Sequence, residues 1–324
     1  MTDPQTLTDD EALEARAYEA FDRGDLAEAS RHFGELLKRQ PDARHLHYMQ
    51  GLTHKYLRDW PTSLEHNLRA QALSDEVNES SAWNAGIAAT ALGDWAQARA
   101  QWRACGIRIP EGEGPIDGDF GLVSIRLNPW GDGETVFARR IDVVRARLLN
   151  VPLPESGHRL FDIVLHDGAS TGQRQLSDGG TVNVFNALAR LEPSDFRTFV
   201  AFVSCDSPDD MEALSAATLP GIGYVEDWTA SITHYCLRCS YGAPHRHEDQ
   251  ADEDWSPDRN LGIGAQSRAA VVRLLQDWAR AAPGRSVEGI EEREVEASEP
   301  ADGHVWWRGA EDDEDEDEDE GPGS

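Results

Sequence analysis

Three similar stretches decide the fold of the first part of the chain: ARAYEAFDRGDLAEASRHFGELLKRQP (15–41), MQGLTHKYLRDWPTSLEHNLRAQALSD (49–75) and NAGIAATALGDWAQARAQWRACGIRIP (84–110). The small residues Ala17, Gly51 and Gly86 mark a period of 34 and then 35 residues. A turn follows each of them, with an Asp and a large apolar residue: Asp25-Leu26, Asp59-Trp60 and Asp94-Trp95. A small residue lets two helices approach closely, and an Asp carboxylate accepts from free N–H groups at a helix start. Each copy therefore predicts a helical hairpin.

These copies resemble the tetratricopeptide repeat (TPR), over roughly a third of the chain. The resemblance implies a stack of hairpins with a concave surface that binds a peptide or a helix of a protein partner. It specifies no chemistry, because a fold does not determine a function. On the inner helices, we expect the partner-binding side chains to be His47, Gln50, His54, Asn84 and Ile87.

The charge of the chain restricts the classes of partner. The formal net charge is -30, and every residue from Glu311 to Glu320 is acidic, which predicts a disordered tail. Without that block the chain still has 50 acidic against 30 basic residues. A nucleic-acid binder neutralises phosphates, so we expect no nucleic acid as a ligand. The field suits a basic protein partner instead.

The sequence also bears on the compartment. It has no apolar run of about 18 residues, so we expect no membrane span and no membrane partner. Residues 1–10 are polar and acidic, unlike a secretory signal, which predicts a cytoplasmic protein.

A Gly/Pro/acidic linker, PEGEGPIDGD (110–119), separates the repeats from a second region. Alternating apolar residues predict strands there, for example at 159–166 and 196–203, with a turn at Asp167-Gly168. The stretch VNVFNALARL (182–191) predicts a helix in its second half, and residues 266–281 predict another helix. The expected fold class is thus α+β multidomain: TPR-like repeats (1–112), a mixed α+β domain (119–285) and an acidic low-complexity tail (286–324).

One segment has the composition of a metal site. Cys236 and Cys239 form a CxxC pair, and His245 and His247 follow within eight residues. Zinc prefers four sulfur or nitrogen ligands in a tetrahedron, so these four residues are our candidate zinc ligands. The short spacing is unusual for a zinc site. Two alternatives stay open: reduced thiols without a metal, and a redox CxxC.

Two other groups of residues are candidates of lower rank. His158, His166 and Asp167 are able to form an acid/base cluster, or simply a turn with a satisfied histidine. The pair Trp306-Trp307, just before the acidic tail, either docks on the folded body or forms a short binding motif.

We therefore carry two hypotheses for the function. The first is a bacterial protein-interaction module that binds a peptide or protein through its repeats. The C-terminal part is similar to an uncharacterised bacterial TPR-linked domain with immunity-type relatives, which implies a narrower version: masking of a basic toxin. The alternative is a zinc-dependent hydrolase with its site in the second domain. Because no general base is recognisable, the sequence favours a protein that is not an enzyme.

Overall fold

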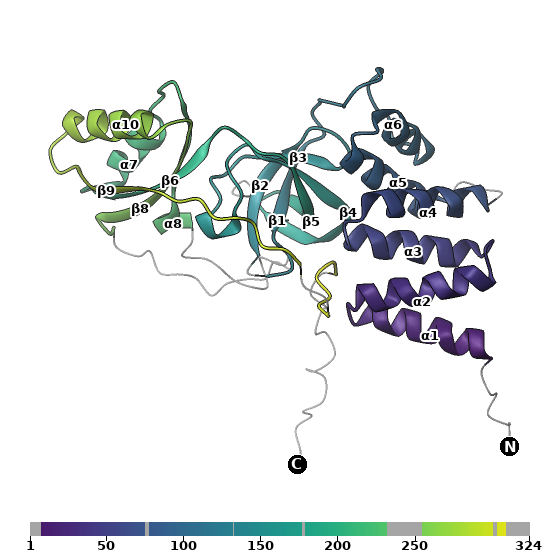
Figure 1. Ribbon diagram of the computed structural model, residues 1–324. Helices are drawn as coiled ribbons and strands as arrows, with labels where there is room; N and C mark the ends of the chain where they lie inside the picture. Colours follow the sequence, from purple (N-terminus) through teal and green to yellow (C-terminus); the bar gives the residue numbers. More distant parts are fainter. Residues whose placement is uncertain are drawn as a thin grey trace, which may run out of the picture.

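The computed structural model describes residues 8–74, 78–131, 133–176, 179–231, 255–300 and 303–308. Figure 1 shows a stack of helices at one end, a β-barrel in the middle and a second sheet with its helices at the other end. The helices of the stack are α1 Asp9–Asp22, α2 Leu26–Arg39, α3 Arg44–Tyr56, α4 Trp60–Ala72, α5 Glu79–Leu92 and α6 Trp95–Ala104. They form the three hairpins that the repeat pattern predicts.

The caps and small residues of the repeats act largely as expected. Asp59 and Asp94 accept hydrogen bonds from the first-turn N–H groups of α4 and α6, whereas Asp25 makes no such bond. A Cβ atom on Gly51 would lie 2.4 Å from the side chain of Asn67. A Cβ atom on Gly86 would lie 2.4 Å from an indole ring of α6. The two glycines therefore let each first helix pack against the second helix of its hairpin.

The barrel follows the linker. Its strands are β1 Leu122–Leu127, β2 Glu134–Arg140, β3 Arg145–Leu148, β4 Ile163–Gln175 and β5 Thr181–Glu192. Neighbouring strands pair antiparallel in chain order, and a parallel pairing of β1 with β5 closes the barrel. Apolar side chains from all five strands fill its interior, among them Ile125, Val136, Leu148, Val164 and Phe185.

Two sequence predictions are wrong within the barrel. Asp167-Gly168 lies inside β4, where irregular pairing with β5 surrounds it, and forms no hairpin turn. Residues 182–191 belong to β5 and form no helix. Ala and Leu in this stretch favour a helix, but pairing with β4 and β1 and burial on both faces override that local preference.

The second sheet has the strand order β7-β8-β6-β9, all antiparallel, with β6 Arg197–Ser204, β7 Ile222–Asp227, β8 Asp258–Ala265 and β9 Ser286–Glu292. Helices α7 (Pro208–Ser215) and α10 (Arg268–Ala281) cover one face, and Leu214, Leu275 and Trp278 pack there against Phe199 and Ile263. The prediction of a helix at 266–281 is confirmed. A short 3-10 helix, Pro154–Ser156, and helix α8 (Trp228–Ser231) lie between the sheet and the barrel.

The region 119–285 thus contains two bodies, a barrel and an α/β sheet. Strand β9 begins at Ser286, so the folded part continues into the segment that the sequence analysis assigned to the tail. Among the described residues, every helix is too short or too polar to cross a bilayer.

Candidate partner-binding surface

The first helices of the repeats present equivalent positions on one face. Glu14 of α1, Tyr48 of α3 and Trp83 of α5 follow the repeat periods, and all three are half-buried. The Tyr48 hydroxyl hydrogen-bonds with Asn84 and Ser80, while burial raises the pKa of the phenol. Tyr48 is therefore held in one orientation beside Trp83 on this row, which we call the inner row.

Two helical turns further along the same face, the equivalent residues Phe21, Lys55 and Thr90 are buried. Trp307 of the C-terminal segment packs on Phe21, and Asp167 of the barrel pairs with Lys55. Apolar residues of the barrel, including Val144 and Leu165, join the core of the repeats in one continuous cluster. The same helix face is thus open at one end and filled at the other.

A buried ion pair fixes the barrel at this place. Lys55 Nζ lies 3.0 Å from Asp167 Oδ1 and 3.2 Å from its Oδ2, and each side chain is only 4% exposed. Next to it, Gly168 packs against the Trp83 indole, where an added Cβ would lie 1.6 Å from Nε1. Only a glycine allows this approach, so β4 and α5 are matched at this contact.

The C-terminal residues Trp306 and Trp307 fill the remaining gap and are 3% and 7% exposed. The Trp307 ring stacks on Tyr56, with centroids 4.6 Å apart, and lies 5.3 Å from Phe21. Trp306 makes edge contacts with Tyr56 and with Trp130 of the barrel. Of the two alternatives from the sequence, the pair docks on the folded body.

Three of the expected partner-binding residues contact the second helices of the repeats. His47 Nδ1 lies 2.9 Å from Nδ1 of His66 in α4. Gln50 Nε2 donates to Ser30 Oγ of α2 at 3.0 Å, and His54 Nε2 lies 2.9 Å from the same hydroxyl. These side chains hold neighbouring helices together, and any further role in binding stays a prediction.

The other two expected residues are also inside the fold. Ile87 is completely buried and Asn84 is 5% exposed, bonded to Tyr48. The sequence analysis missed Tyr48 and Trp83. A helical offset of three residues before Gly51 and Gly86 would have found both, because that offset places them on one face of successive first helices.

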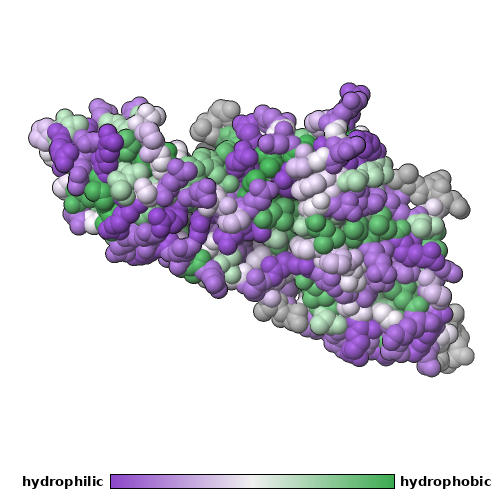
Figure 2. All heavy atoms as spheres, turned by 45° about the horizontal axis from the view of Figure 1, so that its top comes forward, coloured by the Kyte–Doolittle hydropathy of each residue, from purple (hydrophilic) through white to green (hydrophobic). Residues whose placement is uncertain are grey.

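Figure 2 shows hydrophilic residues over much of the visible surface, with hydrophobic patches over the repeats and the adjoining barrel. Partly buried aromatic residues of the repeats, among them Tyr48 and Trp83, pack at the edge of the core of the repeats. Interfaces use such aromatic residues as anchors.

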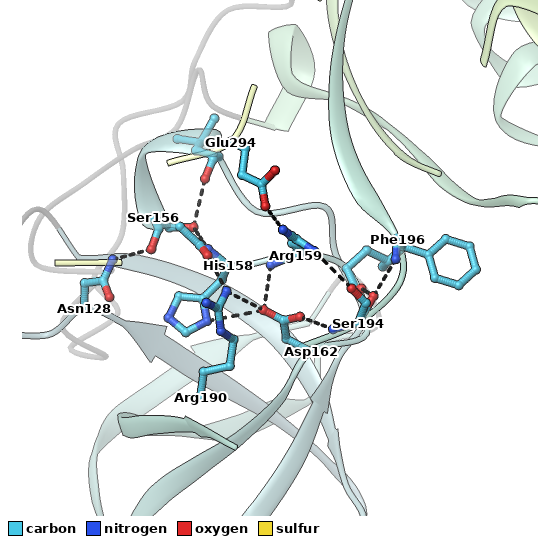
Figure 3. Close-up of polar contacts among 12 residues, drawn as sticks. Asn128, Ser156, His158, Arg159, Asp162, Arg190, Ser194, Phe196 and Glu294 are labelled. Carbon is cyan, nitrogen blue, oxygen red and sulfur yellow. Dashed lines mark hydrogen bonds and ion pairs between the residues drawn. The ribbon is translucent and has the colours of Figure 1, made fainter. Parts of the chain in front are cut away.

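The acid/base candidates from the sequence do not form one cluster. Asp162, which is fully buried, accepts from the backbone N–H groups of Arg159 at 2.9 Å and Ser194 at 2.7 Å. His158 and Arg190 lie beside it, 3.7 and 3.5 Å away (Figure 3). Because Ser194 leads into β6, this network joins the barrel to the second sheet.

The remaining two candidates are on opposite sides of the barrel wall. The His166 ring packs inside against Phe185, and burial lowers its pKa to about 4. Asp167 points outward to Lys55. His158 belongs to the separate network around Asp162, so the three do not form a catalytic arrangement.

A cavity of about 450 Å³ lies between the segment after β3 and the second sheet, lined by Leu153, Pro154, Glu155, Val200, Phe202, Trp228, Thr229, Asn260 and Arg293. Nearby, Glu134 accepts from Leu153 N and Glu226 accepts from Val151 N. Burial, with the neighbouring carboxylates Glu226 and Glu155, raises the pKa of Glu134 to about 8. Glu134 therefore holds its proton more tightly than an exposed glutamate does.

The candidate zinc ligands Cys236, Cys239, His245 and His247 lie outside the described residues. Within the described ranges, no group of three or more His, Cys, Asp or Glu side chains is arranged to hold a metal ion. Burial raises the pKa of the Cys105 thiol to about 11. Because the four candidate ligands lie outside the described residues, the zinc site stays a prediction from the sequence.

No protein-family model and no curated protein matches this chain. Solved TPR structures are similar over its first part. The TPR2B-domain:pHsp70 complex of yeast Sti1 has 18% identity and covers 30% of this chain and 76% of that chain, with a TM-score of 0.28. The first TPR of Spaghetti (RPAP3), bound to an HSP90 peptide, has 17% identity over 30% and 75% of the two chains, also with a TM-score of 0.28.

The TPR domain of Arabidopsis OM64 has 16% identity over 30% of this chain and 78% of that chain, at the same TM-score. The first third of this chain folds as TPR-like repeats. We base this on the chain itself: three helical hairpins, the periods of 34 and 35 residues and the close packing at Gly51 and Gly86.

Proposed function

We propose that this chain is a protein-binding module whose repeats hold a peptide or helix of a partner along the inner row. The observation that carries the proposal is the row itself. Glu14, Tyr48 and Trp83 stay half-exposed, whereas Phe21 and Lys55 on the same face are buried against the chain's own C-terminal segment and barrel.

The arrangement has the physical features of a binding surface. Tyr and Trp offer large contact areas with few rotatable bonds, and such residues contribute much of the energy of interfaces. The hydrogen bonds of Tyr48 with Asn84 and Ser80 hold its ring before a partner arrives. Packing of Gly168 on Trp83 does the same for the indole. Rigid groups lose less entropy on binding, which favours affinity.

Charge supports a narrower hypothesis about the partner. The chain is strongly acidic even without its terminal block, and such a field speeds association with a basic protein. An immunity-type role, in which the partner is a basic toxin, is one form of this hypothesis and rests on the net charge together with the resemblance of the C-terminal part to immunity-type relatives. Binding that weakens as salt is raised would support a basic partner, since salt screens exposed charges.

The experiment compares wild type with Tyr48→Ala and with Tyr224→Ala as a matched control. Tyr224 is 43% exposed on the second sheet, far along the chain from the repeats. Each full-length protein is immobilised and the proteins it captures from source-cell extract are quantified. We expect Tyr48→Ala to lose at least about tenfold of a captured partner, or about 1.4 kcal/mol, and Tyr224→Ala to retain it.

Equal capture by all three proteins would contradict the proposal. A thermal melt of each variant separates lost binding from lost folding. The alternative of a zinc-dependent hydrolase gains no support from the described residues, because its ligands lie outside them.

A further inference from the structure

The C-terminal residues 303–308 bind between the repeats and the barrel in the manner of a peptide ligand. They contribute no helix or strand to either body. Gly303 N donates to the carbonyl of Gly24 in the first repeat at 3.1 Å. Asn186 Nδ2 of β5 donates to the carbonyl of Trp306 at 2.8 Å. Backbone groups of the segment are therefore recognised from both sides of the groove.

Side chains complete this recognition. Trp307 stacks on Tyr56 and Trp306 lies between Tyr56 and Trp130, so the two indoles provide the apolar contact. Arg308 Nη2 donates to Asp22 at 2.6 Å at the open end of the groove. The groove thus selects two adjacent aromatic residues in an extended segment, and the half-exposed Asp22 adds a smaller preference for a cation after them.

The groove does not depend on this segment for its walls. The barrel is fixed on the repeats by Lys55 with Asp167 and by Gly168 against Trp83. In the described residues 293–300, Glu294 and Glu299 pair with arginines at the surface and are 60% and 73% exposed. Exposed ion pairs contribute little to stability. Trp130 Nε1 also donates to the carbonyl of Ser298 at 3.0 Å, and among the described residues 293–308 the two indoles are the buried side chains.

We propose that this groove is a peptide-binding site of the protein, and that the chain's own C-terminal segment is an internal competitor for it. The external ligand is an extended segment of a partner protein with two adjacent aromatic residues and a following basic residue. This inference rests on the proposed function and names the class of partner segment.

The probe is a fluorescently labelled peptide of residues 298–308, SEPADGHVWWR, titrated into full-length proteins. The variant Trp306→Ala/Trp307→Ala removes the internal competitor. We expect it to bind the peptide at least about tenfold more tightly than wild type does. A peptide with both Trp replaced by Ala is the matched control and should not bind. Adding Asp22→Arg to the variant should weaken binding severalfold, because it removes the partner of the arginine.

A second variant covers the case in which the double substitution prevents folding. Gly303 has a φ of +80°, so Gly303→Val strains the docked segment while it retains both indoles. It should also increase peptide binding. Failure of every folded variant to bind the peptide better than wild type would overturn the inference.

Three further outcomes are decisive. A wild-type dimer that disappears in Trp306→Ala/Trp307→Ala would make a second copy the occupant and would overturn the partner assignment. Loss of partner capture on Tyr48→Ala, combined with no peptide binding, would refute only this inference. Peptide binding without an effect of Tyr48→Ala on capture would refute only the inner-row proposal.

Discussion

Lys55 and Asp167 lie 112 positions apart in the chain and form the buried ion pair between α3 and β4. We predict that substitutions at these two positions are strongly non-additive. Lys55→Met leaves the Asp167 carboxylate buried, with hydrogen bonds from Gly168 N at 2.7 Å and from Tyr56. Asp167→Asn leaves a buried ammonium group without its counter-charge.

The structure sets the expected magnitude. Both side chains are 4% exposed, so water cannot replace the missing partner. Removing one member of a buried pair typically costs about 3–5 kcal/mol of unfolding free energy. In the double variant no unpaired charge remains, and the Asn oxygen still accepts from Gly168 N. We therefore expect the double variant to be more stable than either single variant, with a coupling energy of at least about 2 kcal/mol.

The assay is urea unfolding of all four proteins, followed by far-ultraviolet circular dichroism, which reports on the repeats. The matched control is the exposed pair Arg39 and Asp10, which lie 2.6 Å apart with side chains 42% and 39% exposed. The corresponding cycle there should give a coupling below about 1 kcal/mol. If the effects at Lys55 and Asp167 are additive, so that their coupling energy is no larger than that of the control pair, the reasoning from burial is refuted.

Three further predictions concern packing, pH and metal. Gly34→Ala should stabilise α2 by about 1 kcal/mol, because the nearest atom to the added Cβ would be 4.0 Å away. Gly86→Ala should destabilise the repeats, because its Cβ would lie 2.4 Å from an indole ring. Thermal unfolding of the two variants compares these effects. The pKa of Glu134 is raised to about 8, so the folded state binds more protons than the unfolded state between the ordinary value and about 8. Stability should therefore fall as pH rises through this window, and Glu134→Gln should flatten that slope in melts at about pH 5 and about pH 9. If the zinc prediction holds, elemental analysis of protein purified without a His-tag or added metal should find about one zinc per chain. The variant Cys236→Ser/Cys239→Ser should lose this zinc. Wild-type protein that contains no metal under reducing conditions would refute the zinc prediction.

Local sequence predicted the repeats well, for a physical reason. A hairpin of two helices is defined by neighbours in the chain, so Gly51, Gly86 and the capping residues Asp59 and Asp94 suffice to identify it. The strands of the barrel depend on partners far along the chain. Residues 182–191 form β5 because β1 and β4 pair with them, which no local pattern contains.

On the candidate surface, too, local sequence predicted the helices but not the direction of their side chains. The sequence placed binding residues on the inner helices, yet His47, Gln50 and His54 contact the second helices, since the rotation of each helix is fixed by packing. Their role in binding stays a prediction, and Tyr48 and Trp83 are the half-buried aromatic residues of the proposed inner row.

The sequence by itself determined the repeat stack, the helix at 266–281 and the net acidity of the chain, because periodicity and charge are local or summed properties. Only the tertiary structure decided that Asp167-Gly168 meets α3 and α5, and that Trp306-Trp307 occupies the groove beside Tyr56. These contacts join residues that are far apart in the chain, and their energy comes from burial that exists only once the barrel and the repeats have packed together.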